Sequence, residues 1–213
     1  CDEGSFDIAL NQCEEFLKKN PNSPILYNIY GVIQSKLGKI DASIRNYKKA
    51  LSISPKYAEA YNNLGNAYLT KEFYSKAIDS FQNALKHNPD YTLAYFNLGI
   101  AFNKNGESLS AIESYKNALE LNNDYFEANF NLANEFFEKK DYAASIKYYE
   151  KSIKLNPDFA MAYNNIATVF QEIGDIKAAI DNYKKAIQLN QNFFEAYNNL
   201  GMLYESQGLK EDA

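Results

Sequence analysis

An asparagine recurs every 34 residues through most of this sequence. The row consists of Asn63, Asn97, Asn131, Asn165 and Asn199. An asparagine side chain carries both a hydrogen-bond donor and an acceptor, so it can hold the N–H and the C=O of one peptide group. Such a row suits the backbone of an extended polypeptide and does not read its side chains. The alternative interpretation is that these amides are passive, solvated residues on helix surfaces.

Residues that could catalyse a reaction are few and isolated. The single histidine, His87, lies near a predicted helix end, where a solvated polar residue is expected. Cys13 occupies a position filled by an aromatic ring elsewhere, which favours a buried thiol, since no histidine lies nearby to activate it. The motifs GxGxxG, GxxxxGK[ST], HExxH and GxSxG and paired CxxC do not occur. We therefore predict no enzyme activity, no metal site and no cofactor for this chain.

The interval of 34 residues applies to the whole sequence. The segments that follow Ala58 and Phe194 share the letters EAYNNLG and lie four such intervals apart. Counted from Ala58, the sequence predicts a single repeat array over residues 1–213. Complete repeats span 24–57, 58–91, 92–125, 126–159 and 160–193, residues 1–23 form the second helix of a truncated repeat, and 194–213 form another truncated repeat.

Each repeat predicts two helices. Apolar residues at positions 4, 7, 8 and 11 form the stripe of an amphipathic helix, and position 8 is always glycine or alanine. The second helix has small residues at positions 20 and 27 and an aromatic ring at 24, so the two helices can approach closely while rings fill the remaining space. A break near position 15 carries Gly4, Gly38, Gly106, Gly174 and Gly208. Proline at position 32 ends four hairpins, at Pro21, Pro55, Pro89 and Pro157.

The first helix of each repeat has a second face that the core stripe does not use. At about 100° per residue, positions 2, 6, 9 and 13 lie opposite the stripe, and the asparagine row occupies position 6. Solvent-facing Leu93, Phe96, Ile100 and Phe130 would add an exposed apolar patch, which usually marks a contact site. The predicted binding face consists of Asn63, Asn66, Asn97, Asn131, Asn134, Asn165, Asn199, Leu93, Phe96, Ile100 and Phe130. It becomes acidic toward its end through Glu127, Glu138, Glu172, Glu195 and Glu205.

This pattern resembles the tetratricopeptide repeat family over the full sequence, with seven marker positions in register. Local departures are Gln34, Asn129, Lys140, Asn123 and Gln191. The resemblance implies an all-α, right-handed superhelical solenoid of helix-turn-helix repeats, with first helices lining a concave groove. It also implies a likeness to the repeat arrays of O-linked N-acetylglucosamine transferases, which carry an asparagine ladder along that groove. A clamp for acidic chaperone tails is not supported, because positions 2, 5 and 6 hold no Lys or Arg.

Composition restricts the partners and the compartment. Lys and Arg number 22 against 27 Asp and Glu, a net charge of −5 that argues against nucleic-acid binding. No apolar stretch is long enough to cross a membrane, and no signal peptide is recognisable. Cytoplasmic localisation is the default expectation, although Cys1 leaves bacterial lipid attachment as an alternative. The predicted partner is a protein or peptide ligand.

Both ends of the sequence fall inside a repeat, and neither shows a polar capping helix. We therefore expect a fragment of a longer chain. The main functional hypothesis is an interaction scaffold that binds an extended peptide or protein segment in the concave groove. One alternative is the substrate-recruiting region of a larger enzyme, such as a protein O-glycosyltransferase, which a glycosyltransferase domain in the parent chain would reveal. Another is a homo-oligomer formed through the uncapped repeat ends, where Phe6, Ile8 and Phe16 would be exposed.

Overall fold

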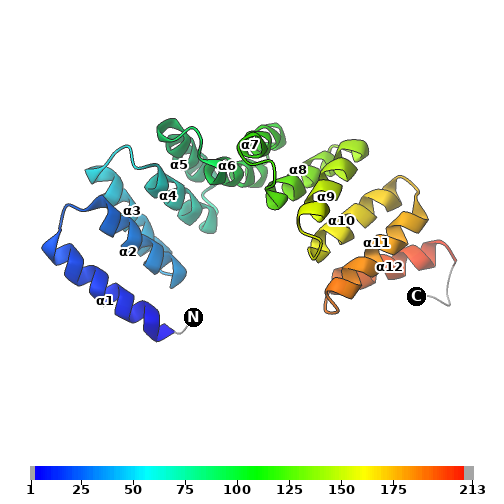
Figure 1. The fold of residues 1–213 in the computed structure, drawn as a ribbon, viewed down its shortest axis with the longest axis horizontal. Helices are drawn as coiled ribbons and strands as arrows, with labels where there is room; N and C mark the ends of the chain where they lie inside the picture. The colour runs from blue at the N-terminus through cyan, green and yellow to red at the C-terminus, as the bar shows by residue number, and fades with distance from the viewer. Residues whose placement is uncertain (1–2, 209–213) are drawn as a thin grey trace. The chain divides into compact units, whose positions relative to one another are not determined.

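The computed structural model describes residues 3–208, with side chains described from residue 8 onward, and these residues form twelve α-helices and no strand (Figure 1). From α1 to α6 and from α8 to α12, consecutive helices pack side by side, and the predicted all-α fold built of helix pairs is confirmed. The helices are α1 (Glu3–Lys19), α2 (Pro24–Lys36), α3 (Ile40–Ile53), α4 (Ala58–Thr70), α5 (Tyr74–His87), α6 (Thr92–Lys104), α7 (Ser108–Leu121), α8 (Phe126–Glu138), α9 (Tyr142–Leu155), α10 (Ala160–Glu172), α11 (Ile176–Leu189) and α12 (Phe194–Ser206).

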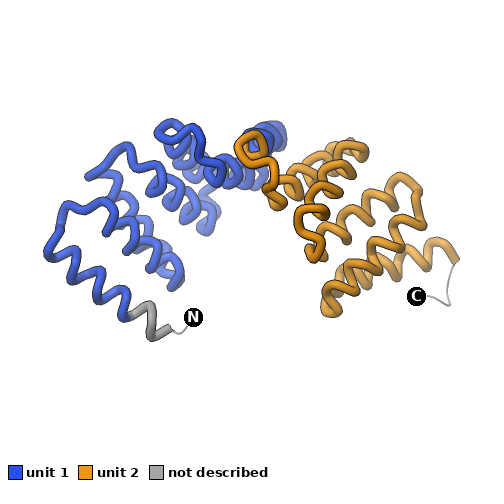
Figure 2. Tube along the Cα trace, viewed as in Figure 1, with its two compact units in different colours: residues 1–117 blue, residues 118–213 orange. Residues whose placement is uncertain are grey.

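The chain divides into two compact units (Figure 2). Unit 1 spans Cys1–Asn117 and unit 2 spans Ala118–Ala213. The core of unit 1 contains Tyr47, Leu64 and Phe81, which come from α3, α4 and α5. In unit 2, Tyr149 of α9 and Tyr183 of α11 are centres of two apolar clusters. The assignment of all residues to one repeat array stays a prediction.

The turn between the two helices of a repeat uses a left-handed backbone conformation at position 15. Gly38, Gly106 and Gly174 have φ values of 74°, 81° and 82°. Two repeats form the same turn without glycine, because Glu72 and Lys140 have φ values of 59° and 58°. A side chain in this region meets steric strain that glycine avoids.

The N-terminal helix differs from the prediction. A break was expected near Gly4, but α1 runs from Glu3 to Lys19 and includes this residue. A turn at position 15 joins two helices, and no helix precedes Glu3 among the described residues. Ile8 and Phe16 on α1 are exposed, as predicted. Cys1, the side chain of Phe6 and the small residue expected at Ala213 lie outside what the structure describes.

The closest approach within a repeat joins position 8 of the first helix to the ring at position 24 of the second. A Cβ atom added to Gly65 would lie 2.6 Å from Cε1 of Phe81, and one added to Gly31 would lie 2.6 Å from Cε1 of Tyr47. Phe81 is fully buried, so its ring has little freedom to withdraw. The equivalent residues of unit 2, Ala133 and Ala167, carry a methyl group, so the rings in their repeats must leave room for it.

Alanine substitution should distinguish glycines that make this contact from one that does not. In Gly65→Ala the new methyl group must displace the Phe81 ring, and we expect a loss of about 1–2 kcal/mol in the free energy of unfolding. Gly201 lies in α12 with no atom within 4 Å of an added Cβ. Gly201→Ala should therefore stabilise the chain by about 0.5–1 kcal/mol, because alanine favours the helix. Urea unfolding followed by circular dichroism measures both, and equal effects would contradict the packing argument.

Glycine substitution at the two strained turns should stabilise the protein. We expect Glu72→Gly and Lys140→Gly each to raise the free energy of unfolding by about 0.5–1 kcal/mol, since relief of left-handed strain exceeds the entropy that glycine gains in the unfolded chain. Gly174→Ala is the matched reverse change and should destabilise by a similar amount. A loss of thermal stability in both glycine variants would show that these turns are not strained.

Candidate functional site

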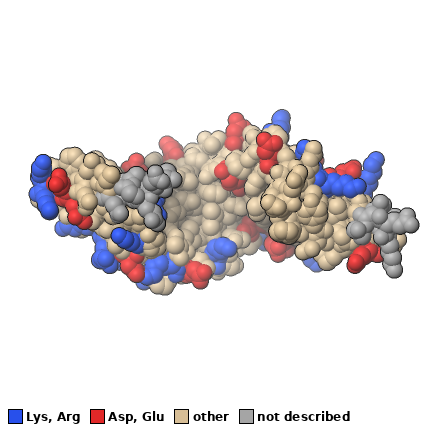
Figure 3. All heavy atoms as spheres, turned by 90° about the horizontal axis from the view of Figure 1, so that it is seen from below, with Lys and Arg blue, Asp and Glu red and all other residues tan. Residues whose placement is uncertain are grey.

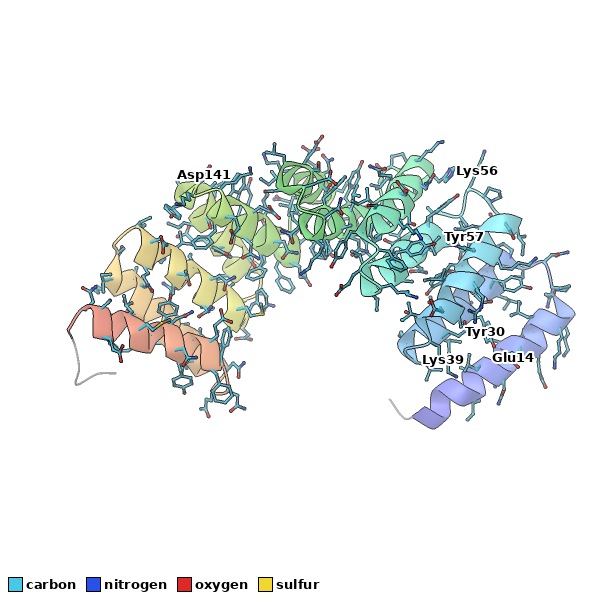
Figure 4. All side chains as sticks on the ribbon, turned by 180° about the vertical axis from the view of Figure 1, so that it is seen from behind. Glu14, Tyr30, Lys39, Lys56, Tyr57 and Asp141 are labelled. Atoms are coloured by element: carbon cyan, nitrogen blue, oxygen red, sulfur yellow. The ribbon has the colours of Figure 1, made fainter. Side chains whose placement is uncertain are left out.

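In unit 1 the asparagine row links first helices of successive repeats. The side-chain Nδ2 of Asn63 donates a hydrogen bond to Oδ1 of Asn28 at 3.0 Å. In the next repeat, Nδ2 of Asn97 donates to Oδ1 of Asn62 at 3.0 Å. Nδ2 of Asn28 donates in turn to the hydroxyl of Tyr57 at 3.3 Å. Tyr57 lies just before α4 (Figure 4). In α4 and α6, position 6 is therefore tied to position 5 of the repeat before it.

Unit 2 contains the same link and one variation of it. Nδ2 of Asn199 donates to Oδ1 of Asn164 at 3.1 Å, which repeats the geometry of unit 1. For Asn165, position 5 of the preceding repeat is Phe130, whose side chain has no hydrogen-bond acceptor. Nδ2 of Asn165 donates instead to Oδ1 of Asn134, one helical turn along α8, at 3.1 Å.

These bonds change the interpretation of the row. The alternative of passive, solvated amides is wrong for Asn63, Asn97, Asn165 and Asn199, because each bridges two repeats. All of them except Asn97, which is buried, are half-buried, and so is Asn131. Within the described residues, the Oδ1 atoms of Asn63, Asn97 and Asn199 accept no hydrogen bond, and one N–H of each amide is unused. Ligand contact by this remaining capacity stays a prediction.

The predicted apolar patch is only partly exposed. Leu93 is 42% exposed, whereas Phe96 and Ile100 are half-buried on α6. The expectation that Phe130 faces solvent is wrong, because this side chain is 8% exposed. Its ring packs edge-on against Phe159 at a centroid distance of 4.9 Å and lies 5.8 Å from the ring of Tyr149. Phe159 lies just before α10, at the end of the same repeat as Phe130, and its ring covers Phe130.

A pocket of about 370 Å³ opens on the first helices of unit 2. Its size is at the lower end of the range for ligand pockets. Side chains of α8, α10 and α12 line it together with one ring of α9: Phe130, Asn134, Phe137, Glu138, Tyr149, Met161, Asn165, Thr168 and Glu195. Three residues of the predicted binding face, Phe130, Asn134 and Asn165, therefore meet in one place.

Hydrogen bonds hold the polar wall of this pocket. Oδ1 of Asn134 accepts from the Tyr149 hydroxyl as well as from Asn165. Oε1 of Glu195 accepts from Nδ2 of the buried Asn164 at 3.3 Å. Burial raises the pKa of the Tyr149 hydroxyl, and the charge of Glu138 raises this pKa further, so the hydroxyl stays protonated and donates at neutral pH. The pocket thus combines aromatic rings, fixed amides and two carboxylates.

The other predicted residues lie on separate helices. Asn63 and Asn66 belong to α4, and Leu93, Phe96, Asn97 and Ile100 belong to α6 of unit 1, while Asn199 lies on α12 of unit 2. Sequence reasoning placed Tyr149 in the core and overlooked the aromatic residue that ends each complete repeat. This second row recurs at the same 34-residue interval and could have been found: Tyr57, Tyr91, Tyr125, Phe159 and Phe193.

His87 and Cys13, the two residues considered for catalysis, pack against other parts of the chain. The ring of His87 stacks on Tyr61 at a centroid distance of 5.8 Å. Cys13 is buried, as predicted, and burial raises the pKa of its thiol. The part of the chain that the structure describes holds no group of three or more metal-ligating side chains. None of the helices described is long and apolar enough to span a membrane.

Comparison with known families places the chain in one of them. A TPR repeat model matches residues 33–72, 133–174 and 169–208, which together make up more than half of the chain. Two tetratricopeptide repeat models match residues 58–91 and 80–113. The chain belongs to the tetratricopeptide repeat family.

Solved structures share the fold. YrrB, described as a TPR protein with an unusual peptide-binding site, has 22% identity and a TM-score of 0.73, over 88% of this chain and 96% of its own. MamA has 28% identity and a TM-score of 0.72, over 79% of this chain and 92% of its own. PilF of Pseudomonas aeruginosa has 17% identity and a TM-score of 0.83, over 93% and 90%. A search of curated proteins finds no match.

A double-mutant cycle should measure the link between repeats. We expect Asn62→Ala and Asn97→Ala to show a coupling of about 0.5–1.5 kcal/mol in the free energy of unfolding, because each change alone removes the same hydrogen bond. Asn66 lies one turn further along α4, at the position used by Asn134 in unit 2, but accepts no side-chain bond from Asn97. The cycle of Asn66→Ala with Asn97→Ala should therefore give a coupling near zero. Similar coupling in both cycles would contradict a specific Asn62–Asn97 bond.

Proposed function

We propose that this chain is a protein-interaction scaffold that binds an extended peptide or protein segment along the face formed by its first helices. The observation that carries the proposal is the unused hydrogen-bonding capacity of amides that are fixed at regular intervals. An amide held by one bond to the neighbouring repeat loses little side-chain entropy when it binds a ligand. The likeness to YrrB, described as having a peptide-binding site, supports the same class of function.

The spacing of these amides favours an extended ligand. Asn63 and Asn97 lie on adjacent first helices in unit 1, and Asn165 and Asn199 do so in unit 2. Each presents a polar group that suits a peptide C=O or N–H, and such groups repeat along an extended backbone. Side-chain specificity then has to come from other residues, and the pocket of unit 2 is the candidate for it.

Loss of two amides should weaken peptide binding. A peptide would first be selected from a displayed random library against the 213-residue chain, and its Kd measured by calorimetry. In the double variant Asn165→Ala with Asn199→Ala, which removes two amides of unit 2, we expect at least a tenfold weaker affinity, since each side-chain bond contributes about 0.5–1.5 kcal/mol. Measurement well below the unfolding temperature, checked by circular dichroism, separates binding from stability.

The matched control removes two amides from second helices. Asn83 and Asn182 donate to backbone carbonyls of their own helices, at Asp79 and Ala178. Asn83→Ala with Asn182→Ala should leave Kd within about twofold. A photo-crosslinking residue placed at Leu93 or Met161 on the first helices should label the peptide, and one placed at Asp79 should not. Equal affinity in the two double variants, or crosslinking from Asp79 alone, would overturn the proposal.

A further inference from the structure

Charge is separated between the two helix types of unit 2. The first helices α8, α10 and α12 contain no lysine or arginine, whereas the second helices α9 and α11 contain six lysines. Apart from Glu135, which is buried, the acidic residues on the first helices are Glu127, Glu138, Glu172, Glu195 and Glu205. No basic side chain within these helices can therefore neutralise the glutamates through a pair three or four residues away.

Unit 1 does not share this pattern. Its first helices α2, α4 and α6 carry only Lys36, Glu59 and Lys104 as charged residues. Figure 3 shows acidic and basic side chains around wide areas without charge. A partner attracted by negative charge would therefore be directed to the first helices of unit 2.

The pocket of unit 2 places two of these carboxylates beside aromatic rings. Glu138 contributes from the end of α8, and Glu195 from the first turn of α12. The rings of Phe130, Phe137 and Tyr149 form the apolar part of the wall. A cation gains from the face of an aromatic ring and from a carboxylate at once, and a guanidinium group matches both through its flat, delocalised charge.

Hydrogen bonds within the chain orient polar side chains of the pocket. Asn164, which is 1% exposed, donates to Glu195 and holds this carboxylate at the pocket. Asn134 accepts from Tyr149 and Asn165, so the amide wall keeps its orientation. No Lys, Arg or His is among the residues that line the pocket, so the lining supplies no cationic side chain to Glu138 and Glu195.

We propose that this pocket takes the basic side chain of an arginine or lysine in the bound peptide, an inference that rests on the proposed function. The occupant is thus an extended peptide with a basic residue, chosen by complementarity to Glu138 and Glu195. The first-helix amides hold its backbone, and the pocket selects one side chain. Binding of this kind weakens as ionic strength rises, because partly exposed carboxylates are screened by salt.

The two methionines of the sequence allow a direct test. Met161 lines the pocket, whereas Met202 on α12 is exposed and lies outside the lining. The probe is a blocked heptapeptide of glycine and serine with a central arginine, titrated into the chain carrying 13C-methyl methionine. We expect the Met161 methyl resonance to shift while that of Met202 stays in place. A peptide with neutral citrulline in place of arginine should bind at least tenfold more weakly.

Matched variants assign the effect to the two carboxylates. Glu138→Gln with Glu195→Gln should weaken binding of the arginine peptide about tenfold or more, while circular dichroism stays unchanged. Glu150→Gln with Asp181→Asn removes two negative charges from exposed sites on the second helices of the same unit and should change Kd less than twofold. Equal affinity for the citrulline peptide, no loss in the Glu138/Glu195 variant, or no Met161 shift at millimolar peptide would overturn the inference.

The outcomes also separate this inference from the proposed function. Library peptides that lose affinity in the Asn165/Asn199 variant but show no preference for a basic residue would support the scaffold and reject the cationic pocket. Library peptides whose affinity does not depend on these amides would reject the proposed function, whatever their charge.

Discussion

The contact between a small residue at position 8 and an aromatic ring at position 24 is the constraint on which each repeat depends. At Gly31, Gly65 and Gly99 the ring of the second helix lies so close that a β-carbon would overlap it. This contact fixes the distance between the two helices and commits one side of the first helix to the hairpin core. The opposite side is then left to neighbouring repeats and to solvent. Because the contact recurs every 34 residues, that free side recurs at the same interval.

Asparagine on this free side links neighbouring repeats and, in the proposed mode of binding, also contacts the ligand. One N–H of each bridging amide is used between repeats, as in the bond from Asn97 to Asn62. A buried amide without such a partner would be costly, so the bond is part of the fold. At Asn63, Asn97 and Asn199 one N–H and the Oδ1 atom are not used by this bond, and in the proposed mode of binding they hold the ligand. In that mode the structural bond and the ligand contact do not compete, since each uses a different part of the same side chain.

The repeat period and the helix pairs could be predicted because they follow from local patterns of apolar, small and aromatic residues. The bridging bonds could not, because the meeting of position 6 with position 5 depends on the stagger between repeats. Phe130 shows a second limit: its position in the helix indicated exposure, but the ring of Phe159, just before α10, covers it. Glu72 and Lys140 show that the turn tolerates side chains where glycine was expected. Helical phase thus predicted which residues share a face, and packing between repeats decided how far each is exposed.

The pocket of unit 2 lies where the amide pattern is interrupted. With Phe130 at position 5, Asn165 turns to Asn134, and the Tyr149 hydroxyl joins the same oxygen. The space that a second asparagine would bridge is bounded instead by rings and by Glu138 and Glu195. A regular amide row treats every peptide backbone alike, so it cannot by itself discriminate between sequences. In the proposed mode of binding, discrimination has to arise at such an interruption, because only there does the face offer depth, apolar contact and charge together.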